Sequence, residues 1–137
     1  MHRLAVTLVT LTMAMSASAS GEAEYKYREG VMRAIGGHMG AIVAIMRGGV
    51  QSEKLVLHAR GMRDLAAVSP DIFPAGSDVD ESEALPSVWE DPEEFARANA
   101  AFKEAAEGFA AAGEAGDTPG QAFRKLGGSC TGCPDDF

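Results

Sequence analysis

Residues 32–46 read MRAIGGHMGAIVAIM and carry the clearest periodic pattern in this sequence of 137 residues. Apolar side chains recur there at i, i+3, i+7, i+10 and i+14, which is the a/d spacing of a helix packed in a bundle. The residues of this stripe are Met32, Ile35, Met39, Ile42 and Met46. The pattern predicts one long helix over residues 22–47, which ends at the pair Gly48 and Gly49.

Four glycines interrupt the predicted helix: Gly30, Gly36, Gly37 and Gly40. Each one costs about 1 kcal/mol relative to alanine inside a helix. We therefore expect a neighbouring helix or a flat ligand to approach closely at these positions.

A second helix is predicted over residues 52–68, with Ser52 as a partial N-cap and Ser69-Pro70 as its end. Its apolar stripe consists of Leu55, Met62 and Leu65, with Ala59 and Ala66 beside it. His58 falls in the same stripe.

Two more helices follow a long connection. Asp91, Pro92 and Glu94 form a strong helix start, with Asp91 as N-cap and Glu94 reaching back from the third position. The same signals recur at residues 118–121 and begin a fourth helix. The apolar positions are Phe95, Phe102 and Phe109 in the third helix and Phe123, Leu126, Cys130, Cys133 and Phe137 in the fourth.

The connection over residues 69–90 is rich in proline and acidic residues, but it also contains Phe73, Leu85, Val88 and Trp89. We expect these four side chains to fold back and close one end of the core. No segment shows sustained strand alternation. Two short connections and one long crossover between helices 2 and 3 predict an all-α protein with one domain, a four-helix bundle.

Residues 1–19 have the pattern of a secretory signal peptide. Arg3 precedes an apolar run over residues 4–15, and the small residues 17–19 fit the cleavage rule. The run is too short to span a membrane. The mature chain, residues 20–137, keeps 11 of the 12 Lys and Arg and all 20 Asp and Glu, a formal charge of −9. That charge argues against a nucleic acid partner.

Cys130 and Cys133 are the two cysteines of the chain. On a helix their sulfurs share one face, so they suit two thioether bonds to one porphyrin, while a disulfide and two free thiols remain open alternatives. Export favours a bonded state, because an unmodified pair would be oxidised outside the cytoplasm. A zinc site is disfavoured because no second pair is present.

Six stretches carry a resemblance to a known family. They are residues 27–30 (YREG), 35–40 (IGGHMG), 73–76 (FPAG), 87–91 (SVWED), 122–123 (AF) and 129–137 (SCTGCPDDF). In order and spacing they closely resemble cytochrome c′ over residues 22–137. The resemblance implies an antiparallel four-helix bundle in the bacterial periplasm, a homodimer, and one covalent haem c whose iron admits NO or CO.

The resemblance also implies roles for single residues. Cys130 and Cys133 match the thioether cysteines, Met32 matches the residue over the distal haem face, and Arg28 matches a basic residue near the haem propionates. The residues of the pocket or its lid would be Trp89, Phe73 and Phe123. Plain core packing is the alternative role for Met32 and for these aromatic residues.

The chain departs from the family at Pro134, where the family has the histidine that binds the iron. Proline offers no donor atom, so three interpretations stay open. The haem iron is bound by another residue or by water, or the cysteines form a disulfide in a haem-free relative, or Pro134 is an error or an engineered change. His58 is the candidate substitute ligand, ahead of His38.

The sequence thus predicts a periplasmic haem c protein for one-electron transfer, NO or CO binding, or both, with a redox partner protein and no enzymatic activity. The alternative is a haem-free bundle with a Cys130–Cys133 disulfide that acts as a structural or partner-binding protein. A thiol–disulfide oxidoreductase has little support, because its C-x-x-C opens a helix after a strand.

Overall fold

The computed structural model describes residues 3–117 and 119–131, with side chains described from residue 20 onward. Every regular element in this part of the chain is helical, so the predicted all-α class is confirmed. The elements are α1 (Arg3–Gly48), η1 (Ser52–Lys54), α2 (Leu55–Val68), η2 (Ser69–Asp71), α3 (Ser87–Glu90), α4 (Pro92–Glu114) and α5 (Gly120–Thr131).

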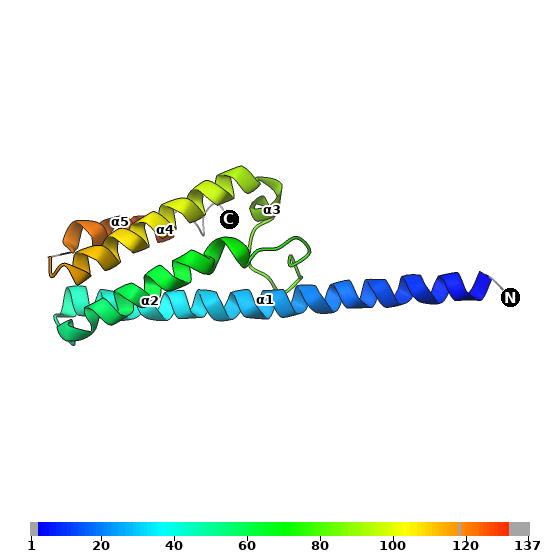
Figure 1. Cartoon of the computed structure of the whole chain (residues 1–137), viewed down its shortest axis with the longest axis horizontal. Coiled ribbons are helices and arrows are strands. Elements are labelled where there is room, and N and C mark those ends of the chain that lie inside the picture. Colours follow the sequence, from blue (N-terminus) through cyan, green and yellow to red (C-terminus); the bar gives the residue numbers. More distant parts are fainter. Residues whose placement is uncertain (1–2, 118, 132–137) are drawn as a thin grey trace.

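The four long helices form a bundle in which α1 packs against α2, α2 against α4, and α4 against α5 (Figure 1). The crossover between α2 and α4 contains the short turns η2 and α3, which the sequence pattern did not predict. α3 is a single helical turn that buries Val88.

The helix boundaries follow local chemistry. α1 ends at Gly48, and Gly49 has a φ of 66°, a conformation that glycine adopts without strain. The Asp91 side chain accepts a hydrogen bond of 3.2 Å from the Glu94 backbone N–H, so the predicted N-cap of α4 is confirmed. The predicted reach-back by Glu94 is wrong, because its carboxylate pairs with Arg97 one turn further along. Ser52 begins the turn η1 and makes no side-chain cap for α2.

The core takes one large, fully buried side chain from each long helix: Ile42, Met62, Phe109 and Leu126. The predicted stripe of α1 is only partly correct. Ile35 and Ile42 are buried and Met39 and Met46 half-buried, whereas Met32 is 45% exposed. Val31 and Ile45 are buried in addition. The helix is therefore rotated relative to the predicted face.

The crossover closes the end of the core with three of the four expected side chains. Val88 is buried, and Phe73 and Trp89 are half-buried. The expectation for Leu85 is wrong, because its side chain is 43% exposed. Leu85 directly precedes Pro86 and α3, and its backbone carbonyl accepts a hydrogen bond from the Val88 N–H at 3.1 Å.

The expected close approach at the glycines of α1 is wrong for the described part of the chain. There, a Cβ atom added at Gly30, Gly36, Gly37 or Gly40 would meet no atom within 4 Å beyond the backbone of α1 itself. Two other glycines lie at tight contacts. A Cβ at Gly21 would overlap the Gly76 carbonyl of the crossover, and one at Gly61 would overlap the His38 ring.

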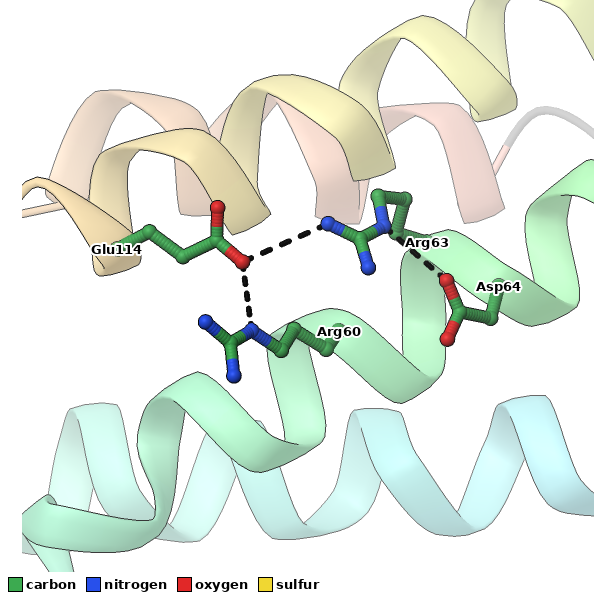
Figure 2. A network of polar contacts seen from close by, with 4 residues as sticks. All are labelled: Arg60, Arg63, Asp64 and Glu114. Atoms are coloured by element: carbon green, nitrogen blue, oxygen red, sulfur yellow. Dashed lines mark hydrogen bonds and ion pairs between the residues drawn. The ribbon is translucent and has the colours of Figure 1, made fainter.

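An ion-pair network joins the end of α4 to α2 (Figure 2). The Glu114 carboxylate accepts hydrogen bonds from Arg60 Nε at 2.6 Å and from Arg63 Nη1 at 3.5 Å. Arg63 Nε also donates to Asp64 at 3.1 Å. The hydrogen bond from Arg60 is the main cause that lowers the pKa of Glu114.

The N-terminal part of α1 extends beyond the other helices (Figure 1). Among the described residues, none of the helices combines the length and the apolar character that crossing a membrane requires. The signal peptide over residues 1–19 stays a prediction.

Candidate functional site

A cavity of about 580 Å³ lies between α1, the crossover, α4 and α5. One wall is apolar and consists of Met32, Ile35, Phe73, Phe95 and Phe102. Another part of the lining is polar and includes Arg28, Glu29, Glu81, Ser82 and Glu83. A space of this kind suits a large, mostly apolar ligand with polar groups at one edge.

Cys130 brings a sulfur atom to this cavity from α5. It is half-buried and lies one helical turn after Leu126, which is fully buried and holds α5 against the core. Ser129 also lines the cavity, and its hydroxyl donates to the Leu126 carbonyl at 2.7 Å. Cys133 and Pro134 lie outside the described residues.

Arg28 is the most constrained polar residue of the site, with 4% of its surface exposed. Its Nη1 atom donates to the Ile72 carbonyl at 3.3 Å and to Ser77 Oγ at 2.8 Å. Its Nη2 atom donates to the Ser77 carbonyl at 2.8 Å and to Ser82 Oγ at 3.1 Å. These bonds hold the crossover in place and direct the guanidinium donors to the protein.

Three aromatic rings surround the same guanidinium. The Arg28 Cζ atom lies 5.0 Å from the Phe73 ring centroid, 5.6 Å from that of Tyr25 and 5.7 Å from that of Trp89. Cation–π attraction adds to the hydrogen bonds at this range. Burial lowers the pKa of Arg28, but a guanidinium stays protonated in proteins. Arg28 therefore fixes the crossover segment that forms the polar wall.

The three aromatic candidates occupy different places. Phe73 lines the cavity, with its ring centroid 4.8 Å from that of Phe95 and 6.4 Å from that of Trp89. Trp89 is not among the lining residues and contacts Phe73 edge-on, while its Nε1 donates to the Pro74 carbonyl at 3.2 Å. Phe123 packs in the core, 6.2 Å from the Phe109 ring centroid, and also lies outside the lining.

Neither His58 nor His38 lines this cavity, although His38 follows the lining residue Ile35 by one turn of α1. The Nδ1 atom of His58 lies 3.2 Å from the Nδ1 atom of His38. The geometry gives no support to His58 as a substitute iron ligand, and the same holds for His38.

Several residues of the lining are not recognisable as such from the sequence. Phe95 and Phe102 stand among the apolar positions of α4, and Glu81 and Glu83 belong to the acidic part of the crossover, yet all four line the cavity. Asn99 also lines the cavity, and its Oδ1 accepts a hydrogen bond from Ser69 Oγ at 2.8 Å. The phenylalanines of α4 recur every seven residues, which indicates that they share one face of the helix. The sequence near them does not reveal that this face borders a cavity.

The residues present fit a haem in part. A large cavity with an apolar wall and a cysteine sulfur at its edge suits a porphyrin attached by a thioether bond. Pro134 provides no axial donor, but two lining residues, Met32 and Tyr25, are of types that ligate haem iron in proteins. The cavity is large enough to suit a macrocycle, whereas Pro134 offers no side-chain donor at the position where the resemblance places the axial ligand.

Comparison with known proteins gives one consistent result. A protein family described as Cytochrome C′ matches residues 23–137. Cytochrome c′ of Pararhodospirillum photometricum is 35% identical over 116 residues, which cover 82% of this chain and 93% of the relative. Cytochrome c-554 of Cereibacter sphaeroides is 34% identical over 122 residues, with coverages of 80% and 88%.

Solved structures resemble the fold over the same length. Cytochrome c′ of Rubrivivax gelatinosus superposes with a TM-score of 0.77 at 28% identity, covering 83% of this chain and 93% of that one. A ferrous variant of cytochrome c prime from Alcaligenes xylosoxidans with bound NO gives a TM-score of 0.76 at 25% identity, with coverages of 84% and 92%.

Proposed function

Because this chain belongs to the cytochrome c′ family, we propose that it is a periplasmic haem c protein that binds diatomic gases and transfers single electrons. Members of the family carry covalently attached haem c. The observation that carries the proposal for this chain is the large cavity between the helices, with an apolar wall and Cys130 at its edge.

Different residues of the chain would bind the haem and shape its surroundings. Cys130 and Cys133 hold the cofactor covalently. Ile35, Phe73 and Phe102 form a wall that excludes water from the site. When bound, haem supplies an iron that changes oxidation state and takes up a diatomic ligand. This division of labour requires no bond-making catalysis by the protein.

Two observations favour gas binding. The apolar wall offers no charged group to a small neutral ligand, and a structural neighbour at 25% identity was solved with NO bound.

The charge of the chain favours electron transfer to a protein partner. The mature chain carries a formal charge of −9, which suits a redox partner with a basic face. A homodimer in the bacterial periplasm completes the proposal.

The test is an absorption spectrum with native mass spectrometry of protein exported to a periplasm that contains the c-type haem attachment machinery. We expect a Soret band, a mass gain of one haem per chain, and the mass of a dimer. The double variant Cys130→Ser, Cys133→Ser is the matched control and should be colourless. Adding NO to the reduced wild-type protein should shift the Soret band.

The same measurement separates the alternative. A colourless wild-type protein whose mass is two hydrogens below that of the dithiol form would establish a Cys130–Cys133 disulfide and overturn the haem proposal. Two variants then report the iron ligand if haem is present. Pro134→His should introduce an axial imidazole and change the spectrum, and Met32→Leu should change it only if the Met32 sulfur binds the iron.

A further inference from the structure

His38 of α1 and His58 of α2 form a pair outside the lining of the cavity. Their Nδ1 atoms lie 3.2 Å apart, their ring centroids 5.3 Å apart, and the ring planes are inclined at 67°. Both side chains are half-buried. Two imidazole nitrogens therefore face each other across a helix–helix contact, within reach of water.

Gly61 of α2 makes room for this pair. A Cβ atom at that position would lie 2.7 Å from His38 Nε2 and 2.9 Å from His38 Nδ1. The His38 ring thus lies directly over the α2 backbone, where a side chain would displace it. In this position the Nδ1 edge of the His38 ring lies toward His58.

We propose that His38 and His58 form a two-histidine site for a divalent late transition-metal ion, with Cu²⁺ as the preferred ion. Metal–imidazole bonds are about 2.0–2.1 Å long, so two nitrogens at the observed separation would subtend an angle of about 100° at a shared ion. That angle lies between the cis angle of a square-planar site and that of a tetrahedral one. A modest rotation of the rings about χ2, which is a soft torsion, would direct both lone pairs to one point.

Proton accounting is consistent with binding near neutral pH. In the metal-free pair one Nδ1–H donates to the other Nδ1, so one ring carries its proton on Nδ1 and the other on Nε2. When both Nδ1 atoms bind an ion, both rings carry the proton on Nε2, and no net proton is released. The neutral imidazole is the form that binds metal ions.

The choice of ion follows from the ligand set. Imidazole suits copper, nickel and zinc, and Cu²⁺ binds most strongly among the divalent ions of the first row. No group of three or more metal-ligating side chains occurs in the described part of the chain. The histidine pair would therefore supply two ligands, and water would occupy the remaining positions.

The test is a titration of the full chain with Cu²⁺ alone, followed by pulsed electron paramagnetic resonance. The cysteine sulfurs are first blocked by haem or by alkylation, so that thiols do not compete. We expect one ion per chain and nuclear modulation from two imidazoles. His38→Gln and His58→Gln should each weaken binding by on the order of tenfold or more, because a single nitrogen loses the benefit of two-point attachment.

Glu107→Gln, at an exposed position on α4, is the control and should leave the affinity unchanged, and it is available whether or not residues 1–19 are cleaved. Equal affinity in wild type and His58→Gln would overturn the proposal. So would a wild-type spectrum with modulation from one imidazole or none, a result that does not depend on whether the variants fold.

Discussion

Gly61 holds the position on α2 where the His38 ring of α1 lies over the backbone. The atoms that a Cβ at Gly61 would meet belong to His38 of α1. The sequence of α2 around Gly61 therefore does not reveal this contact. The four glycines of α1 present the reverse case, because their Cβ positions face open space. At the scale of single residues, the packing role of a glycine depends on what lies opposite.

A pair of alanine substitutions tests this difference. Gly61→Ala should lower the free energy of unfolding by about 1–3 kcal/mol, because the new methyl group displaces the His38 ring. Gly36→Ala should raise it by up to about 1 kcal/mol, because alanine is the better helix former and the position is exposed. Urea unfolding followed by circular dichroism measures both. Changes of the same sign would contradict the structure.

The hydrogen-bond partners of Arg28 likewise lie far from it in the sequence. The family resemblance implies that Arg28 lies near the haem propionates, and Arg28 does line the cavity. Its hydrogen bonds, however, run to residues 72–82, which come more than forty positions later in the chain. Partners at that separation are set by the path of the crossover, which no local pattern specifies.

At the scale of elements, the rotation of α1 shows the limit of periodicity. A strict heptad has a period of 3.5 residues, whereas a straight helix has 3.6, so the predicted stripe drifts around the helix. The buried residues Val31, Ile35, Ile42 and Ile45 mark the face that actually meets the bundle. Met32 turns toward the cavity and stays exposed.

The contact between α2 and α4 yields a pH-dependent prediction. Glu114→Gln removes the acceptor of both arginines and should lower the urea midpoint at pH 7. Hydrogen bonds from Arg60 first, and then the charges of Arg60 and Arg63, lower the pKa of the folded carboxyl below its ordinary value of 4.5. Its stabilising effect is therefore fully present above that value and is lost as the pH falls through the folded pKa.

The measurement compares wild type and Glu114→Gln in urea at pH 7, 5, 4 and 3. The difference between their midpoints should be constant at the two higher values and shrink at the two lower ones. Glu107→Gln, at an exposed position on the same helix, serves as the control. A difference that stays constant down to pH 3 would show that Glu114 acts by packing and not by its charge.

At the scale of the whole molecule, α1 is longer than the bundle that it helps to form (Figure 1). Close after the predicted cleavage site, Gly21 packs tightly against the crossover at Gly76. This arrangement agrees with a bundle that begins near residue 20, although cleavage itself stays a prediction.

Removal of residues 1–19 is the corresponding test. A chain that begins at Ser20 should unfold at the same urea midpoint as the full chain, because the removed part of α1 extends beyond the other helices. Mass spectrometry of the exported protein should find the same N-terminus. A lower midpoint for the shortened chain would show that the first nineteen residues belong to the folded core.

The sequence alone determined the helical class, the Asp91 cap, the glycine end of α1 and the resemblance of the chain to one family. These features depend on neighbours within a few positions or on motifs in fixed order. Only the tertiary structure decided which face of α1 is buried, which aromatic residues line the cavity, where Arg28 donates, and that His38 meets His58. Those outcomes depend on how whole helices rotate and cross, and the energy that selects a rotation is summed over contacts between residues far apart in the chain.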